Sequence, residues 1–358
     1  MKIVTVLGAR PQFVKAATVS RELKKQGIEE IIVHTGQHFD ANMSQVFFDE
    51  MDIPHPHYNL EVSGLQHGAM TGRMLEKVEE VLLKEHPNYV LVYGDTNSTL
   101  AGALAAAKLH IPVAHIEAGL RSFEMKMPEE INRILTDRIS NILFCPTQTA
   151  VDNLQQEGFR NFHCQIRKVG DVMLDAVMFY REKSKSVSKI LATENLGNTK
   201  FVLATLHRAE NTNDPNRLKS ICEALNEINK NVTVVLPLHP RTKNYLQANN
   251  IPLQAHLIDP VGYFDMLQLL HHCELVLTDS GGLQKEAYFF SKYCITLRDQ
   301  TEWVELVQEE ANSIAGADRN TILRDYELAK HKKVSFNPSL YGSGDASKKI
   351  AEALRFHS

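Results

Sequence analysis

The chain has 358 residues, 43% of them hydrophobic and 23% charged, and a formal net charge of −4 at pH 7. These are ordinary values for a globular protein of about two domains, and the lack of a basic excess argues against a nucleic-acid binder. The five cysteines form no CxxC pair and are odd in number, which predicts reduced thiols. With no signal-peptide pattern and no apolar stretch near the ~18 residues of a membrane span, we expect a cytoplasmic protein.

The first half of the chain alternates predicted strands and helices with short connections. Strands are expected at 3–7, 30–34, 89–93, 112–116 and 142–145, and helices at 11–25 and 42–51. The last three strands are nearly continuous apolar runs, as expected when helices cover both faces of a parallel sheet. The pattern predicts a doubly wound α/β domain.

The second half repeats this architecture. Its strands are expected at 201–205, 232–236, 256–258, 275–277 and 294–297, separated by helical patterns. A helix at 173–180 leads into the polar stretch 182–186, where few contacts should cross. We therefore predict two doubly wound α/β domains, comprising residues 1–170 and 171–344.

The segment TDSGGLQKE, from Thr278 to Glu286, predicts a phosphate-binding turn between a strand and a helix. Backbone N–H groups and the positive end of the helix dipole attract an anion there. Gly281 and Gly282 have no Cβ and allow close approach, and the Ser280 hydroxyl adds a donor. Glu286 lies one turn further on and could accept hydrogen bonds from ribose hydroxyls. The alternative is a turn that merely needs glycine.

In α/β sheets, ligands bind beyond the carboxyl ends of the strands. After the first strand, Arg10 and Lys15 lie near a helix start, where two cations suit an anionic ligand. A solvated helix start remains an equal alternative. A GxGxxG fingerprint needs two further glycines beside Gly8, so a nicotinamide cofactor is not expected.

Three carboxylates follow other predicted strands. Asp95 lies at a strand tip, where it could also be a helix N-cap. His115 and Glu117 point to the same face of an extended strand, so both reach a ligand if either does. Glu129 lies in the first turn of a helix, where an acid also stabilises the helix dipole.

His207 and His239 each follow a strand of the second half, close to an arginine. Together with His115 and Glu117, these two histidines could be imagined as metal ligands. The sequence has neither an HExxH motif nor a close ligand pair, so we expect no bound metal. A phosphate seat with cations, three carboxylates and histidines suits a nucleoside-diphosphate sugar.

Six motifs resemble those of the non-hydrolysing UDP-N-acetylglucosamine 2-epimerase family and span nearly the whole chain. They are GARPQFVK (8–15), VYGDTNSTLA (92–101), HIEAGLRS (115–122), PEEINR (128–133), ATLHRAEN (204–211) and LTDSGGLQKEA (277–287). The resemblance implies two Rossmann-like domains with a cleft between them, as in B-type glycosyltransferases, and a C-terminal helix (345–358) that packs back on the first domain. A homodimer without a cofactor is also expected.

The resemblance further implies that C2 of a UDP sugar is inverted by elimination and re-addition of UDP. The residues that match the family's acid–base set are Asp95, Glu117, Glu129 and His207. Those that match substrate-binding positions are Arg10, Lys15, His115, Arg133, His239, Ser280, Gly281, Gly282 and Glu286. Gln37, His38 and Arg73 match the region of a second, activating UDP-N-acetylglucosamine site in some bacterial members.

Departures from the family pattern bear on the substrate. The family often has GTRPE where this chain has GARPQ (8–12), and a basic residue where this chain has Trp303. Together with residues 34–40 and 121–127, these two segments resemble those of the family branch that acts on UDP-2,3-diacetamido-2,3-dideoxy-glucuronate. A hydrolysing 2-epimerase that releases UDP, a B-type glycosyltransferase and a non-catalytic nucleotide-sugar sensor are the competing hypotheses.

Overall fold

The computed structural model describes residues 1–37, 48–49, 51, 53 and 55–355. The chain divides into two compact units, which we call unit 1 (Met1–Ala176 with Pro338–Ser358) and unit 2 (Val177–Asn337). The sequence predicts domain ends after residues 170 and 344.

The polar stretch at 182–186 was wrongly expected to follow a helix end. Helix α7 runs from Val172 to Val187 and includes the whole stretch. Ser184 is fully buried, donates its hydroxyl hydrogen bond to the Arg181 carbonyl oxygen, and accepts one from the side chain of Gln268. Lys185 pairs with Glu182 three residues earlier on the exposed side. The helix therefore continues because the polar residues are distributed over its buried and solvated faces.

Unit 1 contains a seven-stranded parallel sheet of order β3-β2-β1-β4-β5-β6-β7. The strands are β1 (Lys2–Leu7), β2 (Glu29–His34), β3 (Tyr58–Asn59), β4 (Tyr89–Tyr93), β5 (Val113–Ile116), β6 (Ile142–Cys145) and β7 (Gln165–Lys168). The two edge strands, β3 and β7, were missed because neither contains an apolar run. The other five confirm the predicted strands to within one residue at each end.

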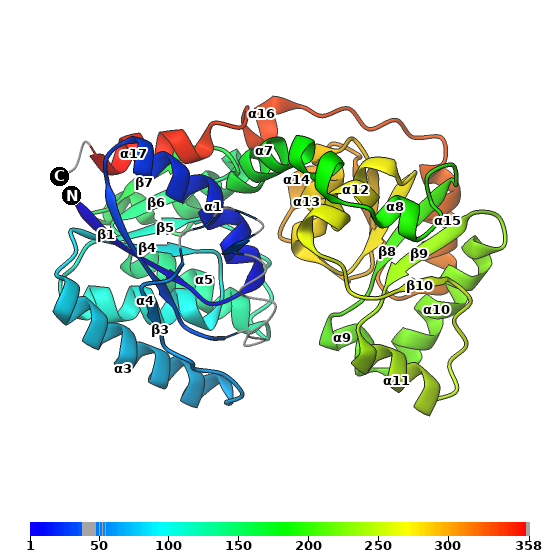
Figure 1. Ribbon diagram of the computed structural model, residues 1–358, viewed down its shortest axis with the longest axis horizontal. Helices are drawn as coiled ribbons and strands as arrows, with labels where there is room; N and C mark the ends of the chain where they lie inside the picture. The colour runs from blue at the N-terminus through cyan, green and yellow to red at the C-terminus, as the bar shows by residue number, and fades with distance from the viewer. Residues whose placement is uncertain (38–47, 50, 52, 54, 356–358) are drawn as a thin grey trace. The chain divides into compact units, whose positions relative to one another are not determined.

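The helices of unit 1 cover both faces of this sheet (Figure 1). They are α1 (Arg10–Lys25), α3 (His67–Glu85), α4 (Asn97–Lys108), α5 (Pro128–Ile139), α6 (Gln148–Gln156), α16 (Pro338–Tyr341) and α17 (Ala346–Arg355), with a short 3-10 turn (Phe159–Asn161). The helix predicted at 42–51 falls almost entirely outside the described residues.

Small residues allow α4 to pack closely on the sheet of unit 1. A Cβ atom built on Gly102 would lie 3.1 Å from three side-chain carbons of Val6 on β1. On the other face, α17 packs against α1, and the Ser347 and Thr18 hydroxyls are 2.9 Å apart. Asp175 of α7 accepts hydrogen bonds from the backbone N–H groups of Ala346 and Ser347, at 3.2 and 2.7 Å. The last helix is thereby held to unit 1 by a buried carboxylate that caps its first turn.

Unit 2 contains a six-stranded parallel sheet of order β10-β9-β8-β11-β12-β13. The strands are β8 (Phe201–Thr205), β9 (Thr233–Pro237), β10 (His256–Ile258), β11 (Leu275–Thr278), β12 (Tyr293–Thr296) and β13 (Asn312–Ile314). The helices are α8 (Ile190–Thr193), α9 (Ala209–Thr212), α10 (Pro215–Asn229), α11 (Pro240–Ala248), α12 (Tyr263–His272), α13 (Gly281–Phe289), α14 (Val304–Gln308) and α15 (Arg319–Ala329). The predicted fold class, two doubly wound parallel α/β sheets, is confirmed.

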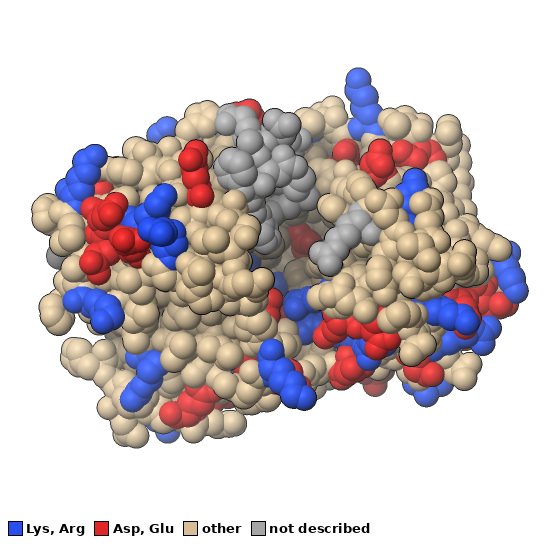
Figure 2. Space-filling view, turned by 90° about the horizontal axis from the view of Figure 1, so that it is seen from below, with Lys and Arg blue, Asp and Glu red and all other residues tan. Residues whose placement is uncertain are grey.

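Figure 2 shows basic and acidic side chains interspersed on the face that it presents, in agreement with the small net charge. Among the described residues, no helix combines the length and the apolar character that a membrane crossing requires.

Candidate active site

The predicted site residues of unit 1 follow the carboxyl ends of three adjacent parallel strands. Lys15 lies on α1 after β1, Asp95 follows β4, and Glu117 follows β5. Because the carboxyl ends of parallel strands share one edge of a sheet, the fold brings these three side chains to the same edge. The side chain of Arg10 lies outside what the structure describes.

Glu117 has an unusual backbone and a buried side chain. Its φ angle of 74° is in the left-handed region, which a non-glycine residue seldom adopts outside functional or tightly constrained sites. The N–H groups of Glu117 and Ala118 both donate to the carbonyl oxygen of Phe144, at 3.1 Å, and hold this turn. The carboxylate forms an ion pair with Lys15, and each of these two residues is 8% exposed. Lys15 therefore supports a carboxylate in addition to any role toward a phosphate.

Gly94 leaves room for this ion pair. A Cβ atom at Gly94 would lie 3.3 Å from Glu117 Oε2 and 3.4 Å from Lys15 Nζ, and the glycine has a φ of +63°. A side chain here would be both strained and crowded against the pair. The turn after β4 and the turn after β5 are thus shaped together around Glu117.

Asp95 forms the end of a chain of charged side chains. Arg133 Nη2 lies 2.7 Å from Asp95 Oδ2, and Arg133 Nη1 lies 2.6 Å from Glu130 Oε2. The N-cap of α4 is Thr96, whose hydroxyl accepts from the Thr99 N–H, so Asp95 does not serve as that cap. The sequence had left capping open for Asp95, and the structure instead gives its carboxylate an arginine partner.

The first turn of α5 contains two acids with different surroundings. Glu130 is buried and accepts hydrogen bonds at 2.9 Å from the N–H groups of Ser122 and Phe123. Burial alone would raise the pKa of Glu130, but these backbone bonds and the charge of Arg133 lower it below its usual value. Glu129, the predicted member of the acid–base set, is half-buried beside it. Glu130 thus orders the loop before α5, a role that sequence reasoning missed.

His115 occupies a fully buried position with both ring nitrogens engaged. Nδ1 lies 2.7 Å from Asp137 Oδ1, and Nε2 lies 2.7 Å from the carbonyl oxygen of Gly94. Both ring nitrogens therefore have a hydrogen-bond partner within the protein. His115 therefore has no ring nitrogen left for a substrate, and the structure gives it a supporting role in place of the predicted binding role.

Asp137 is the centre of this buried cluster and was not singled out in the sequence. It also accepts hydrogen bonds from Arg121 Nη1, at 2.7 Å, and from the Gly119 N–H, at 3.1 Å. Burial would raise the pKa of Asp137, but the hydrogen bond and charge of His115 and the charge of Arg121 lower it. Glu130, Arg133 and Asp137 are spaced three and four residues apart on the buried side of α5, and this spacing is the signal that could have revealed them.

Gln12 joins the turn after β1 to the turn after β4. Its Oε1 accepts from the N–H groups of Gly8 and Ala9, at 2.8 and 2.9 Å, and its Nε2 donates to the Tyr93 carbonyl oxygen at 2.7 Å. A glutamate here could not donate to that carbonyl oxygen. The departure from the GTRPE pattern therefore has a structural account in this chain.

In unit 2, the predicted phosphate seat forms the start of α13. Ser280 is the N-cap, and its hydroxyl accepts from the Leu283 N–H at 3.4 Å. A Cβ atom on Gly282 would meet no atom within 4 Å, whereas one on Gly281 would lie 2.4 Å from Glu302 Oε1. The two glycines therefore differ: Gly282 leaves the helix start open, and Gly281 makes room for a protein carboxylate. Glu286 is buried one turn further along.

His207, at the end of β8, is paired with the buried Asp279 at the end of β11. His207 Nδ1 lies 2.9 Å from Asp279 Oδ1, and the histidine side chain is 55% exposed while the aspartate side chain is fully buried. Asp279 also accepts from the backbone N–H groups of His207 and Arg208. Burial would raise the pKa of Asp279, but the hydrogen bond and charge of His207, with these backbone bonds, lower it. His239 follows β9 and is exposed.

Two of the three residues predicted for an activating site, Gln37 and Arg73, lie among the described residues. Gln37 Oε1 accepts from the backbone and the hydroxyl of Ser98, at 3.1 and 2.8 Å. Arg73 is exposed on α3 and pairs with Glu76 at 2.8 Å. His38 lies outside the described residues.

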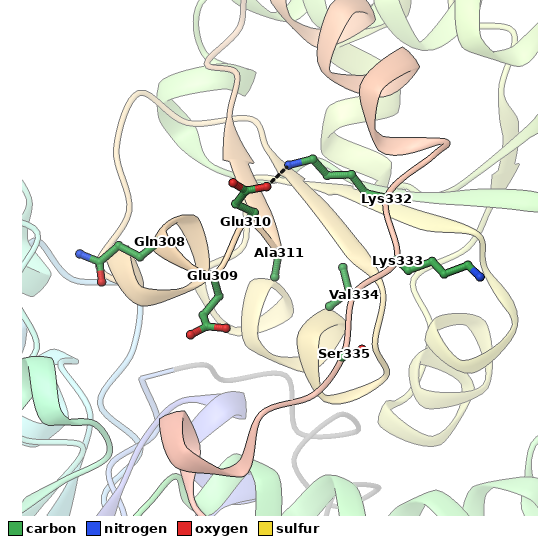
Figure 3. A pocket seen from close by; sticks show the side chains of 8 residues that line it. All are labelled: Gln308, Glu309, Glu310, Ala311, Lys332, Lys333, Val334 and Ser335. Atoms are coloured by element: carbon green, nitrogen blue, oxygen red, sulfur yellow. Dashed lines mark hydrogen bonds and ion pairs between the residues drawn. The ribbon is translucent and has the colours of Figure 1, made fainter.

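A surface pocket of about 380 Å³ in unit 2 is separate from these residues. Figure 3 shows the ion pair between Lys332 and Glu310, with a 3.0 Å separation, among the side chains that line it. The pocket contains none of the predicted site residues. Within the part of the chain that the structure describes, no three His, Cys, Asp or Glu side chains are grouped to bind a metal ion.

Comparisons with known proteins agree with this arrangement. The family model for UDP-N-acetylglucosamine 2-epimerase matches residues 21–355. The chain is 58% identical to the UDP-2,3-diacetamido-2,3-dideoxy-D-glucuronate 2-epimerase of Pseudomonas aeruginosa, over 99% of both chains. It is 43% identical to the UDP-N-acetylglucosamine 2-epimerase of Methanocaldococcus jannaschii, again over 99% of both chains.

Solved structures of UDP-GlcNAc 2-epimerases also match this chain over nearly its whole length. The crystal structure of the Methanocaldococcus jannaschii enzyme in complex with UDP-GlcNAc and UDP matches with a TM-score of 0.93 and 42% identity, over 99% of this chain and 100% of that one. The Neisseria meningitidis UDP-GlcNAc 2-epimerase bound to UDP-GlcNAc matches with a TM-score of 0.89 and 32% identity, over the same shares. The chain belongs to the UDP-N-acetylglucosamine 2-epimerase family.

Proposed function

We propose that this protein reversibly inverts C2 of a UDP-2-acetamido-2-deoxy sugar. The single observation that best supports this is the 58% identity to a 2-epimerase along the whole chain. Glu117 and Asp95, which follow the carboxyl ends of two neighbouring strands, supply carboxylates for the reaction. The constrained backbone of Glu117, with its buried partner Lys15, indicates a carboxylate held in one position for chemistry rather than for folding alone.

The reaction consists of an elimination and its reversal. A carboxylate removes the C2 proton, the C1–O bond to UDP breaks, and the C2–H electron pair forms a C1=C2 double bond in a 2-acetamidoglucal. The oxygen of UDP then adds back to C1 as a proton is delivered to the opposite face of C2. Two faces need two proton-transfer positions, and Asp95, Glu117, Glu129 and His207 form the proposed acid–base set. Carboxylates also stabilise the positive charge that develops at C1 as UDP departs.

We assign the diphosphate of UDP to the start of α13 in unit 2. First-turn N–H groups and the helix dipole favour an anion there, and the open position of Gly282 allows its approach. Ser280 can donate its hydroxyl proton to a phosphate while it accepts from Leu283. In the proposed site, Glu286 binds the ribose, and Arg10, Lys15, Arg133 and His239 complete the substrate contacts.

The proposed substrate is UDP-2,3-diacetamido-2,3-dideoxy-glucuronate. Identity is higher to the epimerase of that name, at 58%, than to the Methanocaldococcus UDP-N-acetylglucosamine 2-epimerase, at 43%. Purified protein should be incubated separately with this compound and with UDP-N-acetylglucosamine, and the C2 epimers quantified by NMR. We expect the diacetamido uronate to reach epimeric equilibrium at the higher kcat/KM, and the reverse order would reject the substrate assignment.

The same incubation separates the alternative functions. A hydrolysing epimerase would release one equivalent of UDP per epimerised sugar, whereas the proposed enzyme forms the C1–O bond to UDP again in its product. A glycosyltransferase would need an acceptor and leave C2 unchanged, and a sensor would bind without turnover. A homodimer stays a prediction, which sedimentation velocity measures. A cytoplasmic location stays a prediction from the sequence pattern.

Gly282→Val should weaken UDP binding by about tenfold or more while the protein remains folded. A β-branched side chain would occupy the space that Gly282 leaves open beside the first-turn N–H groups, and it meets no protein atom within 4 Å of its Cβ. Titration calorimetry with UDP measures the affinity. Gly197→Val is a suitable control, since Gly197 also faces open space but lies between α8 and β8. Equal UDP affinity in both variants would remove the start of α13 from the proposed site.

A further inference from the structure

The carboxylate of Asp279 accepts hydrogen bonds from the ring of His207 and from the turn that follows β8. Asp279 Oδ1 lies 2.9 Å from Nδ1 of the ring. Its two oxygens also accept the His207 N–H, at 3.1 and 3.0 Å, and one accepts the Arg208 N–H at 2.9 Å. The amide of Asn211 adds a donor at 3.3 Å. Within the described part of the chain, each of these contacts places a donor against the carboxylate.

These contacts determine which ring nitrogen of His207 carries the proton. An ionised carboxylate can only accept, so the Nδ1 atom that it contacts must be the protonated one. The lowered pKa of Asp279 agrees with an ionised state. In the neutral ring, Nε2 is then unprotonated, and the side chain is 55% exposed. The ring is thus held at one end and can exchange a proton at the other.

We propose that Asp279 is the positioning residue of His207: it fixes the Nδ1–H tautomer and the ring orientation, so that Nε2 is the atom that accepts and returns a proton. This inference rests on the proposed function, in which His207 takes part in proton transfer. Asp279 itself does not take the proton, because it is surrounded by donors at the end of a buried strand. It acts through the histidine.

The tautomer can be measured without any assay of turnover. The full-length protein labelled with ¹⁵N-histidine gives long-range ¹H–¹⁵N spectra that distinguish protonated from unprotonated ring nitrogens, and His207→Gln identifies the His207 signals. In spectra of the neutral ring, we expect a protonated Nδ1 and an unprotonated Nε2. A neutral His207 with its proton on Nε2 would overturn the proposal.

Asp279→Asn should reverse this arrangement. The Asn oxygen can accept the backbone N–H groups of His207 and Arg208, which directs the amide Nδ2 toward the ring as a donor. Nδ1 then becomes the acceptor and the proton moves to Nε2. We expect kcat to fall by about 10²- to 10⁴-fold, with a much smaller change in KM, because the proton-accepting atom is lost while the substrate contacts remain. Retention of the Nδ1–H tautomer with wild-type kcat would contradict the proposed role.

Asn211→Ala separates the tautomer from the packing of the same turn. The Asn211 amide donates to Asp279 and, at 2.8 Å, to the Leu297 carbonyl oxygen, but it does not contact the ring. We expect this variant to lose thermal stability, keep the Nδ1–H tautomer, and lose far less kcat than Asp279→Asn. An equal loss of kcat with the tautomer unchanged would show that turn packing, and not the tautomer, limits turnover.

Even if Asp279→Asn does not fold, the wild-type spectrum shows which ring nitrogen of His207 carries the proton and so tests the proposal. Failure of the proposed function is distinguishable, since the wild-type protein would then epimerise neither UDP sugar. Full epimerase activity in His207→Gln would instead remove His207 from the acid–base set and overturn the role of Asp279.

Discussion

Replacing Glu117 by Gln should lower kcat by about 10²- to 10⁴-fold, the usual contribution of a positioned acid or base. Glutamine keeps the size of the side chain but cannot take a proton from C2. The substitution also leaves Lys15 without its buried carboxylate partner, so we expect a loss of stability as well. Initial rates of epimerisation and thermal unfolding should be measured together.

The two consequences of this substitution can be separated with a second change. In the double variant Glu117→Gln/Lys15→Met, neither side chain is charged, so much of the lost stability should return while the activity does not. Glu124→Gln is the matched control, since Glu124 lies in the loop after Glu117 and its carboxylate accepts a local N–H, that of Lys126. Normal turnover in folded Glu117→Gln would move Glu117 out of the acid–base set and leave it a purely structural acid.

Asp137→Asn should destabilise the protein by about 3 to 5 kcal/mol, the typical cost of removing one partner from a buried ion pair. Arg121 would lose the carboxylate that balances its charge, and His115 would lose a hydrogen-bond partner; the side chains of both are fully buried. The wild-type cluster is also tied to the Gly119 N–H, next to the turn that positions Glu117. Chemical denaturation at pH 7 measures the change.

The same cluster predicts a dependence of stability on pH. The pKa of Asp137 is lower in the folded chain than its ordinary value of 3.8, so the unfolded chain binds more protons between these two values. The stabilisation that Asp137 provides is therefore present above pH 3.8 and is lost as the pH falls through the folded pKa. Asp152 is exposed on α6, so Asp152→Asn removes the same charge and should have little effect on stability. If both variants unfold at the same denaturant concentration, the buried cluster does not stabilise unit 1.

Most of the strands could be predicted because each is a continuous apolar run followed by a turn. Strands β4, β6, β8 and β10 begin and end at the predicted residues. Of the edge strands in the described residues, β10 was found, but β3, β7 and β13 were not, because a strand that is held by backbone pairing on one side can form without an apolar run. The continuation of α7 through a polar stretch was missed because Ser184 is buried by contacts with α12, which lies far away in the sequence.

The side chains that end the strands were predictable, whereas their supporting partners were not. Asp95, Glu117 and His207 could be selected because each lies one or two residues after the end of a strand. His115 looked equivalent to Glu117 by the period of two, but its neighbours Asp137 and Gly94 come from an adjacent helix and loop. Asp279 also follows a strand and could have been selected by the same rule. It was passed over because the glycines and the serine beside it account for the motif on their own.

The most direct test of the proposed mechanism is the origin of the C2 hydrogen in the product. The reaction should be run in deuterium oxide with the preferred UDP sugar, and the epimer examined by NMR and mass spectrometry. Elimination and re-addition predict one deuterium at C2 of the product, together with slow release of UDP and the glucal on prolonged incubation as the intermediate escapes. Epimer that retains only protium at C2 after many turnovers, or turnover that requires added NAD, would contradict proton transfer by Asp95, Glu117, Glu129 and His207.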